Sequence, residues 1–389
     1  MEVLRAWFAA RMALALLVCA PALGWGTSMQ LLTPDKGWAV TGGRLFWTAD
    51  NGSHWKDITP RAIGFIDTVF FLDTSRGWVL FSDGDENSNL ISFRLASTTD
   101  SGQTWAITPL EVPDQRADEL DGRGWVDFVN PLHGWIILLR NSSSAFSLGR
   151  LFATSDGGES WREFGPPVAG RPVFNTTKDG WISGPGWAGM FSTYDGGKTW
   201  QDNGPSLQDL PPSLPTQPSY GDVKFTDAKH GAVPIWLQPS NDAEESRGTA
   251  LVLYVTDDGG RTWKRERTLT DRGTFSKYGG ALSRIGVDAL VPDPSGVGSS
   301  LVVAFNDRKH LNRLTLMTVL RGESTTDAAP SVSSENVLWR HGDDVAGLSF
   351  TSSVQGWART ALGDLLLTMD GGVTWKNIGP TRPPVAPAH

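Results

Sequence analysis

The sequence of 389 residues is poor in cysteine, in tyrosine and in basic charge. Its single cysteine excludes intramolecular disulfides, Cys-based zinc sites and iron–sulfur clusters. Lys and Arg number 34 against 42 Asp and Glu, which gives a net charge of −8, and the chain has no basic run. The electrostatic footprint of a nucleic-acid-binding protein is therefore missing. We expect no nucleic-acid partner, no metal and no cofactor.

Long apolar segments are also missing, except near residue 1. Arg5 and Arg11 precede an apolar run over residues 12–18, and small residues follow at 20–24. This order is typical of a secretory signal peptide, and the run is short for a bilayer span. A lipoprotein site at Cys19 is the alternative, but Val18 stands where a small residue is expected. We expect residues 1–24 to be a signal peptide, and the mature chain to be a soluble, exported monomer, periplasmic or extracellular.

The chain is rich in tryptophan (18) and glycine (44), and both residue types follow a repeat. The pattern Thr-x-Asp-x-Gly-x-x-Trp occurs six times, and successive tryptophans of the pattern lie 50, 56, 39, 63 and 112 residues apart. Because 112 is twice 56, one unit has lost its motif, and the sequence predicts seven units. The aspartates are Asp50, Asp100, Asp156, Asp195, Asp258 and Asp370, and the tryptophans are Trp55, Trp105, Trp161, Trp200, Trp263 and Trp375.

A second signature precedes each motif. An apolar residue stands six positions before a glycine, and in five of six cases tryptophan follows that glycine; the pairs are Leu31–Gly37, Phe71–Gly77, Phe128–Gly134, Phe174–Gly180, Phe225–Gly231 and Phe350–Gly356. Leu290 and Gly296 keep this spacing inside the long gap. Alternating apolar residues between Gly, Asn and Asp clusters favour antiparallel hairpins, four strands to a unit.

Seven such units predict an all-β fold, a seven-bladed β-propeller of four-stranded antiparallel blades with the motif on a hairpin. A solenoid is the alternative, but it needs capping repeats, which the sequence does not show. The expected propeller covers residues 25–380, and residues 381–389 are expected to be a disordered tail. The blades are expected near 28–60, 64–110, 122–166, 170–205, 219–268, 276–341 and 343–380.

The motif has a structural explanation that needs no catalysis. Its glycines supply positive φ angles for a tight turn without steric cost. The aspartate can accept hydrogen bonds from the backbone N–H groups of the turn, with help from the threonine hydroxyl. The tryptophan opens the fourth strand and can cover the outer edge of the blade with a large apolar face. We therefore expect the six aspartates to stabilise turns.

These residues resemble the Asp-box (bacterial neuraminidase repeat) superfamily. Gly-Trp combined with Asp-Gly-Gly-x-Thr-Trp, as at Gly180-Trp181 and Asp195–Trp200, looks most like the photosystem II assembly and stability factor family. That resemblance implies a seven-bladed propeller without catalytic activity. It also implies a protein or peptide partner, such as an unassembled subunit of a membrane complex. The fold hosts unrelated activities, so the motif indicates the repeat more strongly than the function.

Loop lengths indicate where a partner would bind. From the residue after the second-signature glycine to the motif tryptophan, the separation is 17, 27, 26, 19, 31 and 18 residues, whereas the two turns keep their lengths. Variable second-to-third-strand and blade-to-blade connections share one face of a propeller, so function is expected there. The contact-capable residues expected on it are Arg116, Arg123, Arg140, Trp187, Trp236, Tyr278 and Arg359. Arginines would grip carboxylates, whereas Trp187 and Trp236 would stack on a polysaccharide.

Three further interpretations of the sequence stay open. Residues 83–89 carry oxygen side chains at alternate positions like a calcium loop, but Ser88 and Arg94 depart from the EF-hand pattern. Five prolines make residues 205–218 an expected stiff, extended connection. A sialidase-like hydrolase would need a tyrosine or a carboxylate pair, but the chain lacks the Arg-Ile-Pro signature. The candidates would be Tyr194, Tyr220, Tyr254 and Tyr278, with Asp114, Glu119, Asp121 and Glu244.

Overall fold

The computed structural model describes residues 29–62, 64–85, 90–113, 120–140, 149–184, 189–240, 248–270, 282–292, 299–307, 314–320, 334–336, 345–352, 354–360, 362–372 and 374–380. The expected signal peptide with Cys19 and the expected tail at 381–389 lie outside these residues, as do Arg116, Trp187 and Tyr278. Within the described part of the chain, no helix is long and apolar enough to cross a membrane.

The described strands form seven antiparallel sheets, numbered here in chain order. Sheet 1 contains β1 (Met29–Leu31), β2 (Gly37–Thr41), β3 (Arg44–Thr48) and β4 (Lys56–Asp57), and sheet 2 contains β5 (Phe65–Phe71), β6 (Gly77–Asp85), β7 (Leu90–Thr98) and β8 (Ala106–Leu110). Sheet 3 contains β9 (Leu120–Phe128), β10 (Gly134–Arg140), β11 (Gly149–Thr154) and β12 (Arg162–Phe164), and sheet 4 contains β13 (Pro172–Phe174), β14 (Gly180–Ser183), β15 (Met190–Thr193) and β16 (Gln201–Asp202). Sheet 5 contains β17 (Gln217–Tyr220), β18 (Lys224–Phe225), β19 (Gly231–Gln238), β20 (Ala250–Thr256) and β21 (Lys264–Thr270). Sheet 6 contains β22 (Leu282–Pro292), β23 (Ser299–Asp307), β24 (Leu314–Leu320) and β25 (Ser334–Asn336), and sheet 7 contains β26 (Val345–Phe350), β27 (Gly356–Thr360), β28 (Leu365–Thr368) and β29 (Lys376–Asn377).

The expectation of seven four-stranded blades is wrong at sheet 5. Among the described strands there are six four-stranded blades, and sheet 5 has five strands because β17 and β18 both pair with β19. The inner strand is interrupted at residues 221–223, opposite Pro234 of β19. Proline has no N–H to donate to a sheet ladder, and Gly221 instead donates its own N–H to the Pro234 carbonyl (2.8 Å). The stretch without a motif nevertheless contains the four-stranded sheet 6.

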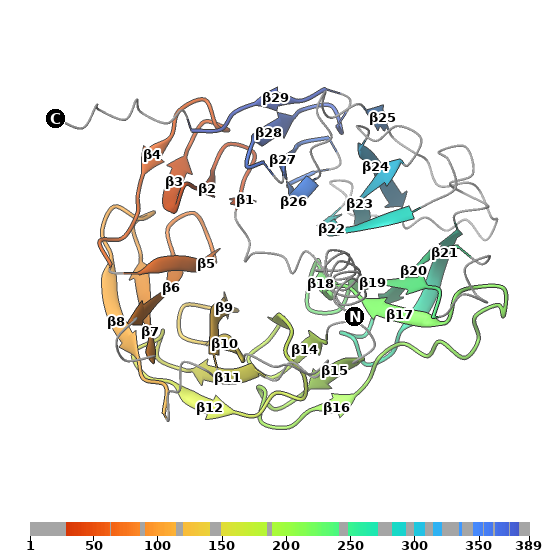
Figure 1. Cartoon of the computed structure of the whole chain (residues 1–389), viewed down its shortest axis with the longest axis horizontal. Coiled ribbons are helices and arrows are strands. Elements are labelled where there is room, and N and C mark those ends of the chain that lie inside the picture. Colours follow the sequence, from red (N-terminus) through yellow and green to blue (C-terminus); the bar gives the residue numbers. More distant parts are fainter. Residues whose placement is uncertain are drawn as a thin grey trace, which may run out of the picture.

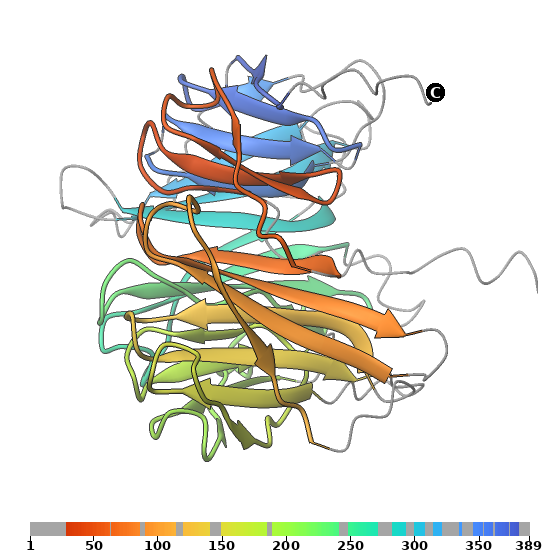
Figure 2. The same cartoon turned by 90° about the vertical axis from the view of Figure 1, so that its left-hand side faces the viewer.

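The sheets follow one another around a central axis, with the first strand innermost and the last outermost (Figure 1). The strands run between two opposite faces of the ring (Figure 2). Because neighbouring strands are antiparallel, first-to-second and third-to-fourth connections share one face, and all other connections share the opposite one. We call the first the box face, since it holds the Thr-x-Asp-x-Gly turns, and the second the loop face.

The strand register explains the spacing of the second signature. The apolar residue and the glycine are direct cross-strand partners, as in Phe128 opposite Gly134 and Phe174 opposite Gly180. The ring lies on the glycine so closely that a Cβ on Gly134 would come within 2.4 Å of Phe128 Cδ1. Glycine in a strand often marks such a close approach. The spacing of six residues is therefore the separation across one hairpin turn. The aromatic residue ends the first strand and covers the glycine that begins the second strand.

The tryptophan after that glycine packs on the next sheet. Trp78 of sheet 2 stacks on Phe128 of sheet 3 at 3.7 Å between ring centroids, and Trp135 of sheet 3 stacks on Phe174 of sheet 4 at 3.6 Å. The Trp78 indole N–H donates to a carbonyl in the following box turn, that of Gly157 (3.3 Å). The two sequence signatures thus meet at the junction between successive sheets, which is why they occur together.

Sheets 1 and 7 close the ring, and each is built from its own continuous stretch of chain. The Trp357 indole N–H donates to Asn51 Oδ1 (2.9 Å), and the Trp55 indole N–H donates to the Ile378 carbonyl (2.6 Å). The two indoles also pack on each other at 5.6 Å between centroids. We call this junction the seam. Within the described residues it is held by side-chain packing and hydrogen bonds, because β29 and β1 are not consecutive strands of the chain.

The proline-rich segment 205–218 forms two turns and not the extended connection expected from its composition. The Leu210 N–H donates to the Leu207 carbonyl (3.3 Å), and the Leu214 N–H donates to the Pro211 carbonyl (3.0 Å). These three leucines pack on the core of sheet 5. Burial of apolar side chains favours the turns over the extended form that the prolines alone would prefer.

Candidate functional site

The Thr-x-Asp-x-Gly turns form the same hydrogen-bond pattern in all six places. In sheet 4 the Thr193 hydroxyl donates to Asp195 Oδ1 (2.9 Å) and accepts the N–H of Gly197 (2.9 Å). Asp195 Oδ1 also accepts the Thr199 N–H (2.9 Å), and Oδ2 accepts the Thr199 hydroxyl (2.6 Å). A histidine ring, His54, takes the place of that last hydroxyl in sheet 1. Both oxygens of each carboxylate are thus engaged within the turn.

These hydrogen bonds lower the pKa of five box aspartates, which are Asp50, Asp100, Asp156, Asp195 and Asp258. The His54 side chain and then its backbone N–H hold the pKa of Asp50 at about 2, and the Thr104 side chain and N–H do the same for Asp100. Hydrogen bonds from Ser160 lower the pKa of Asp156 as well. A carboxyl group with so low a pKa stays ionised near neutral pH, so it is poorly suited to donate a proton as a general acid. The box aspartates fit a structural role.

Each box turn is tied to the turn between the first and second strands of its sheet. One backbone N–H of the box donates to a carbonyl of that neighbouring turn at 2.7 to 2.9 Å, so the box face consists of paired short turns. The pairs are Asn51 to Asp35, Ser101 to Ser75, Gly157 to Leu132, Gly196 to Lys178, Gly259 to Lys229 and Gly371 to Val354.

Replacing Asp195 by alanine should destabilise the hairpin of sheet 4 by about 1–3 kcal/mol, because the turn donors lose their acceptor. Asp195→Asn keeps one side-chain oxygen and should lose less. Urea denaturation of the two variants measures the difference. Binding activity in the folded fraction should be unchanged in both. Loss of binding at full stability would assign the box a functional role.

Most residues expected at a binding site remain predictions. Arg123 lies in β9 and Arg140 ends β10, but their side chains are not among the described ones. Arg116, Trp187 and Tyr278 lie outside the described residues, and so do the hydrolase candidates Asp114, Glu119 and Glu244. The Asp121 side chain is also outside the described set, although Asp121 belongs to β9.

Two of the expected binding residues are placed elsewhere by the structure. Trp236 is only 4% exposed, because β19 continues to Gln238 and both of its faces are covered, so Trp236 is not a stacking platform. Arg359 lies in β27 and not in a loop, and its Nη1 donates to the Val40 carbonyl (2.7 Å) across the seam. Burial of the guanidinium lowers the pKa of Arg359. The side chain therefore helps to close the ring.

The described tyrosines also have structural surroundings. The Tyr254 hydroxyl donates to the Ser206 carbonyl (2.8 Å), and the Tyr194 hydroxyl accepts the Asn203 side-chain N–H (3.0 Å). Burial raises the pKa of Tyr254 and of Tyr220. A raised pKa makes a tyrosine a weaker nucleophile near neutral pH, the opposite of what a sialidase-type mechanism requires.

An exposed aromatic residue on the loop face was not among the binding residues expected from the sequence. Phe65 begins β5 and is 79% exposed. The preceding Gly64 has a φ of 116°, and a Cβ there would lie 2.4 Å from the Ser82 carbonyl oxygen. A β-bulge follows between Ile66 and Thr68. Bulges re-aim side chains, and this one lies beside Phe65, whose ring is exposed at the loop-face end of the innermost strand of sheet 2. It was missed because its connection, residues 58–64, is short.

Asp127 is the second residue that sequence analysis missed. It precedes Phe128 in β9, accepts the backbone N–H groups of Phe128 and Phe174, and lies near Arg171 of the next sheet. Burial raises the pKa of Asp127 to about 6, although Arg171 opposes the rise. The corresponding positions in the other sheets are Gln30, Phe70, Val173, Lys224 and Ser349, so an acid before the aromatic was the available signal.

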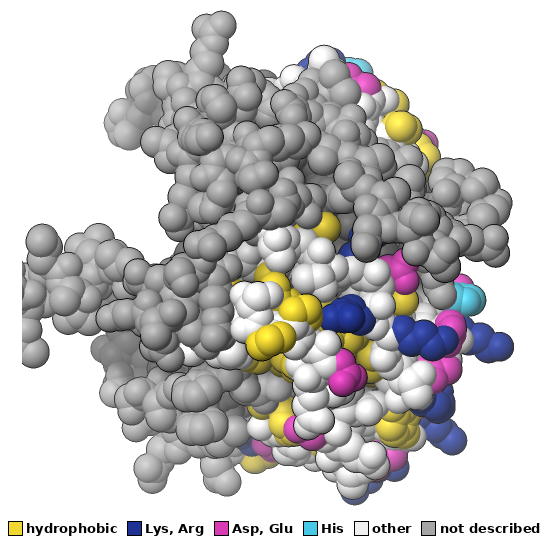
Figure 3. All heavy atoms as spheres, turned by 90° about the vertical axis from the view of Figure 1, so that its right-hand side faces the viewer, with side chains coloured by type: hydrophobic (Ala, Val, Ile, Leu, Met, Phe, Trp, Pro, Cys, Tyr) yellow, Lys and Arg dark blue, Asp and Glu magenta, His cyan; other side chains and the backbone are white. Residues whose placement is uncertain are grey.

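No further site is evident on the described flank shown in Figure 3 or among the described metal-ligating residue types. The described flank in Figure 3 mixes apolar, cationic and acidic side chains without one dominant kind. No group of three or more His, Cys, Asp or Glu among the described residues is placed to hold a metal ion. Of the calcium-like stretch, Asp83 lies in β6 and pairs with Arg94 (3.6 Å), and residues 86–89 are outside the described residues.

The fold and the two unequal faces define a β-propeller. No protein-family model matches the sequence, and no curated protein matches it. Among solved structures, the chain is similar to YCF48 bound to a D1 peptide, with a TM-score of 0.52, 15% identity, and coverage of 90% of this chain and 93% of that one. It is also similar to YCF48 from Cyanidioschyzon merolae, with a TM-score of 0.50, 16% identity, and coverage of 83% and 88%.

A GH74 enzyme from Niastella koreensis is a more distant match, with a TM-score of 0.42, 14% identity, and coverage of 91% of this chain and 59% of that one. At such identities the similarities to YCF48 show the fold alone.

Proposed function

We propose that the protein is an exported, non-catalytic β-propeller scaffold that binds a protein or peptide segment on its loop face. In this proposal sheet 5, with its interrupted inner strand, counts as the remaining blade of a seven-bladed ring. The protein would assist the assembly or stability of an envelope or membrane complex, in a role resembling that of photosystem II assembly factors. The observation that carries the proposal is the contrast between a box face of paired turns and a loop face that presents Phe65.

The chemistry of the partner follows from the side chains expected on that face. Arginine binds carboxylates through paired hydrogen bonds, so Arg116, Arg123 and Arg140 favour an acidic segment or a C-terminal carboxylate. Phe65 adds an apolar contact, and aromatic and arginine residues dominate binding energy in protein interfaces. The solved YCF48 structure with a D1 peptide supports a peptide ligand over a polysaccharide.

The test starts from a pull-down with the mature protein from the envelope fraction of the source, followed by a peptide array of the captured protein. Phe65→Ala should weaken binding of the best peptide about tenfold, as expected for a contact residue. Leu132→Ala is the matched control, because Leu132 is also exposed (53%) but lies on a turn of the box face. It should bind like the wild type.

Salt dependence tests the arginines. Binding should weaken as ionic strength rises and fall further in Arg140→Ala, because exposed charge pairs are screened. If Phe65→Ala binds the peptide as tightly as the wild type and binding does not change with ionic strength, the loop face is not the binding site. Reproducible turnover of fluorogenic sialosides or other glycosides by the purified protein would replace the scaffold proposal by the hydrolase alternative.

A further inference from the structure

One core position distinguishes sheet 4 from the other sheets that carry a box. Three residues before the box threonine the chain has leucine in five sheets and methionine only in sheet 4, and all six side chains are buried; they are Leu45, Leu95, Leu151, Met190, Leu253 and Leu365. In sheets 2 and 3 this leucine lies against the following box. A Cβ on Gly158 would be 2.8 Å from Leu95 Cδ2, and a Cβ on Gly197 would be 3.0 Å from Leu151 Cδ2.

At the junction of sheets 4 and 5 an indole occupies that place. A Cβ on Gly260 would lie 2.6 Å from Trp181 Cζ2 and 2.8 Å from its Nε1. Met190 packs in the same apolar cluster as Trp181. Methionine is unbranched and adaptable, so it does not hold a neighbour in place as a leucine does. At two other junctions an isoleucine takes this place, Ile58 against Gly102 and Ile378 against Gly52, so among these five box glycines only Gly260, beside the sheet with Met190, meets an indole of the preceding sheet.

This placement changes the ring geometry and the hydrogen bonding of Trp181, although the side chain stays buried against sheet 5. Its ring is inclined by 40° to Phe225, whereas the corresponding pairs at the two preceding junctions are inclined by 6° and 4°. Trp38 and Phe71, at the junction of sheets 1 and 2, are inclined by 35°. Trp181 Nε1 is buried and has no hydrogen-bond partner among the described residues, and the same holds for Trp263 Nε1 of this junction. The equivalent indoles of sheets 1, 2, 3 and 7 all donate: Trp38 to Gln30, Trp78 to Gly157, Trp135 to Gly196 and Trp357 to Asn51.

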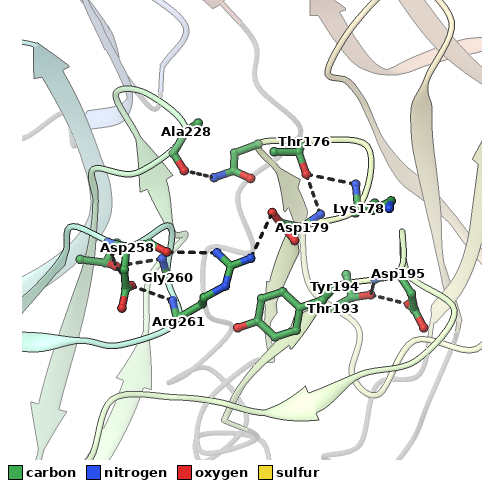
Figure 4. A network of polar contacts seen from close by, with 12 residues as sticks. Thr176, Lys178, Asp179, Thr193, Tyr194, Asp195, Ala228, Asp258, Gly260 and Arg261 are labelled. Carbon is green, nitrogen blue, oxygen red and sulfur yellow. Dashed lines mark hydrogen bonds and ion pairs between the residues drawn. The ribbon is translucent and has the colours of Figure 1, made fainter.

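The polar contacts that remain at the box-face end of this junction are weak (Figure 4). Arg261 Nη2 lies 3.9 Å from Asp179 Oδ2, with the two side chains 57% and 21% exposed, and the Arg261 guanidinium carbon lies 5.3 Å from the centroid of the Tyr194 ring. The Asn175 side chain donates to the Ala228 carbonyl, and Asn203 donates to the Gly260 carbonyl, at 3.3 and 3.2 Å. Exposed ion pairs contribute little to stability, and a buried donor without an acceptor opposes closure.

We propose that the ring opens most readily between sheets 4 and 5, and that Met190 sets this property. Opening separates the two box turns and also the loop-face ends of these sheets, where the Ser183 hydroxyl donates to the Gly221 carbonyl (3.2 Å). The junction is thus a conformational device whose action does not depend on what the loop face binds. Two reciprocal substitutions at this core position separate local opening of the junction from a general change in stability.

Hydrogen exchange of the whole mature protein, read by mass spectrometry, tests the proposal. Amides of β15 and of the sheet 5 box should exchange about tenfold faster than those of β11 and the sheet 4 box, because local opening controls exchange. Met190→Leu should remove most of this difference, and Leu151→Met should create a similar one at the junction of sheets 3 and 4. Equal exchange at the two junctions in the wild type, or no response to Met190→Leu, overturns the proposal.

A second pair of variants tests the role of the buried Trp181 indole N–H that has no hydrogen-bond partner among the described residues. Trp181→Phe and Trp135→Phe remove the same atoms from equally buried positions, but only Trp135 gives up a hydrogen bond. Local exchange at the junction of sheets 4 and 5 should stay the same or slow in Trp181→Phe, while exchange at the junction of sheets 3 and 4 should rise about tenfold in Trp135→Phe. Equal acceleration in the two variants would show that Trp181 is as well bonded as Trp135, and the proposal would fail.

Discussion

Replacing Trp357 by alanine should lower the free energy of unfolding by about 3–5 kcal/mol and open the ring at the seam. The side chain is fully buried in a cluster with Met29, Leu31 and Ile378, so truncation leaves a large cavity. Its indole N–H also holds Asn51 of sheet 1. Urea denaturation measures the loss of stability, and small-angle scattering measures the radius of gyration of the folded fraction.

Trp135→Ala is the matched control for the seam. Trp135 is as buried as Trp357 and likewise bonds the following box turn, but a backbone connection joins sheets 3 and 4. Both variants should lose stability by similar amounts, and only Trp357→Ala should become less compact. If the two variants have the same radius of gyration, side-chain contacts at the seam are not what closes the ring.

Replacing Asp127 by asparagine should stabilise the protein at pH 7 by about 3 kcal/mol at most. Burial raises the pKa of Asp127 from 3.8 to about 6, so the folded protein at pH 7 holds a carboxylate that the fold disfavours. A shift of about two units corresponds to roughly 3 kcal/mol. Because the folded pKa is above the unfolded one, the wild type gains stability as pH falls from 7 to 4, relative to the variant, and loses it as pH rises.

The measurement is urea denaturation of the wild type and Asp127→Asn at several pH values between 4 and 8. The difference between the two proteins should be largest above pH 6 and vanish near pH 4. Arg171→Gln provides the control, since Arg171 opposes the rise, and without it the pKa of Asp127 should rise further and the inflection should move to higher pH. A difference that does not change with pH would mean that the carboxyl titrates normally.

The repeating part of this fold could be predicted from the sequence because it is encoded locally. The aromatic-to-glycine spacing is one hairpin, and the Thr-x-Asp-x-Gly turn is closed by its own side chains. Each signature therefore needs only neighbouring residues to form. The antiparallel sheets and the β-propeller class follow from counting such units.

The rest depends on contacts between distant residues, which local patterns do not show. A strand covered on both faces, such as β19, reads as a continuous apolar run, so nothing in the sequence separated Trp236 from an exposed loop residue. Arg359 and Asp127 point toward neighbouring sheets, and the chain gives no sign of which partner each one meets. Phe65 is exposed because of a bulge, which hydrophobic alternation cannot predict.

The seam also has a consequence for how the protein folds. Its hydrogen bonds join residues separated by 306 to 323 positions, whereas the other junctions link sheets that follow one another along the chain. Closing so long a loop carries an entropic cost, but that cost grows only with the logarithm of loop length. An arc of sheets can therefore form first from nearer contacts, with ring closure as a late and slow step. Moving the chain ends to another sheet-to-sheet connection would shift that slow step around the ring while every native contact stayed the same.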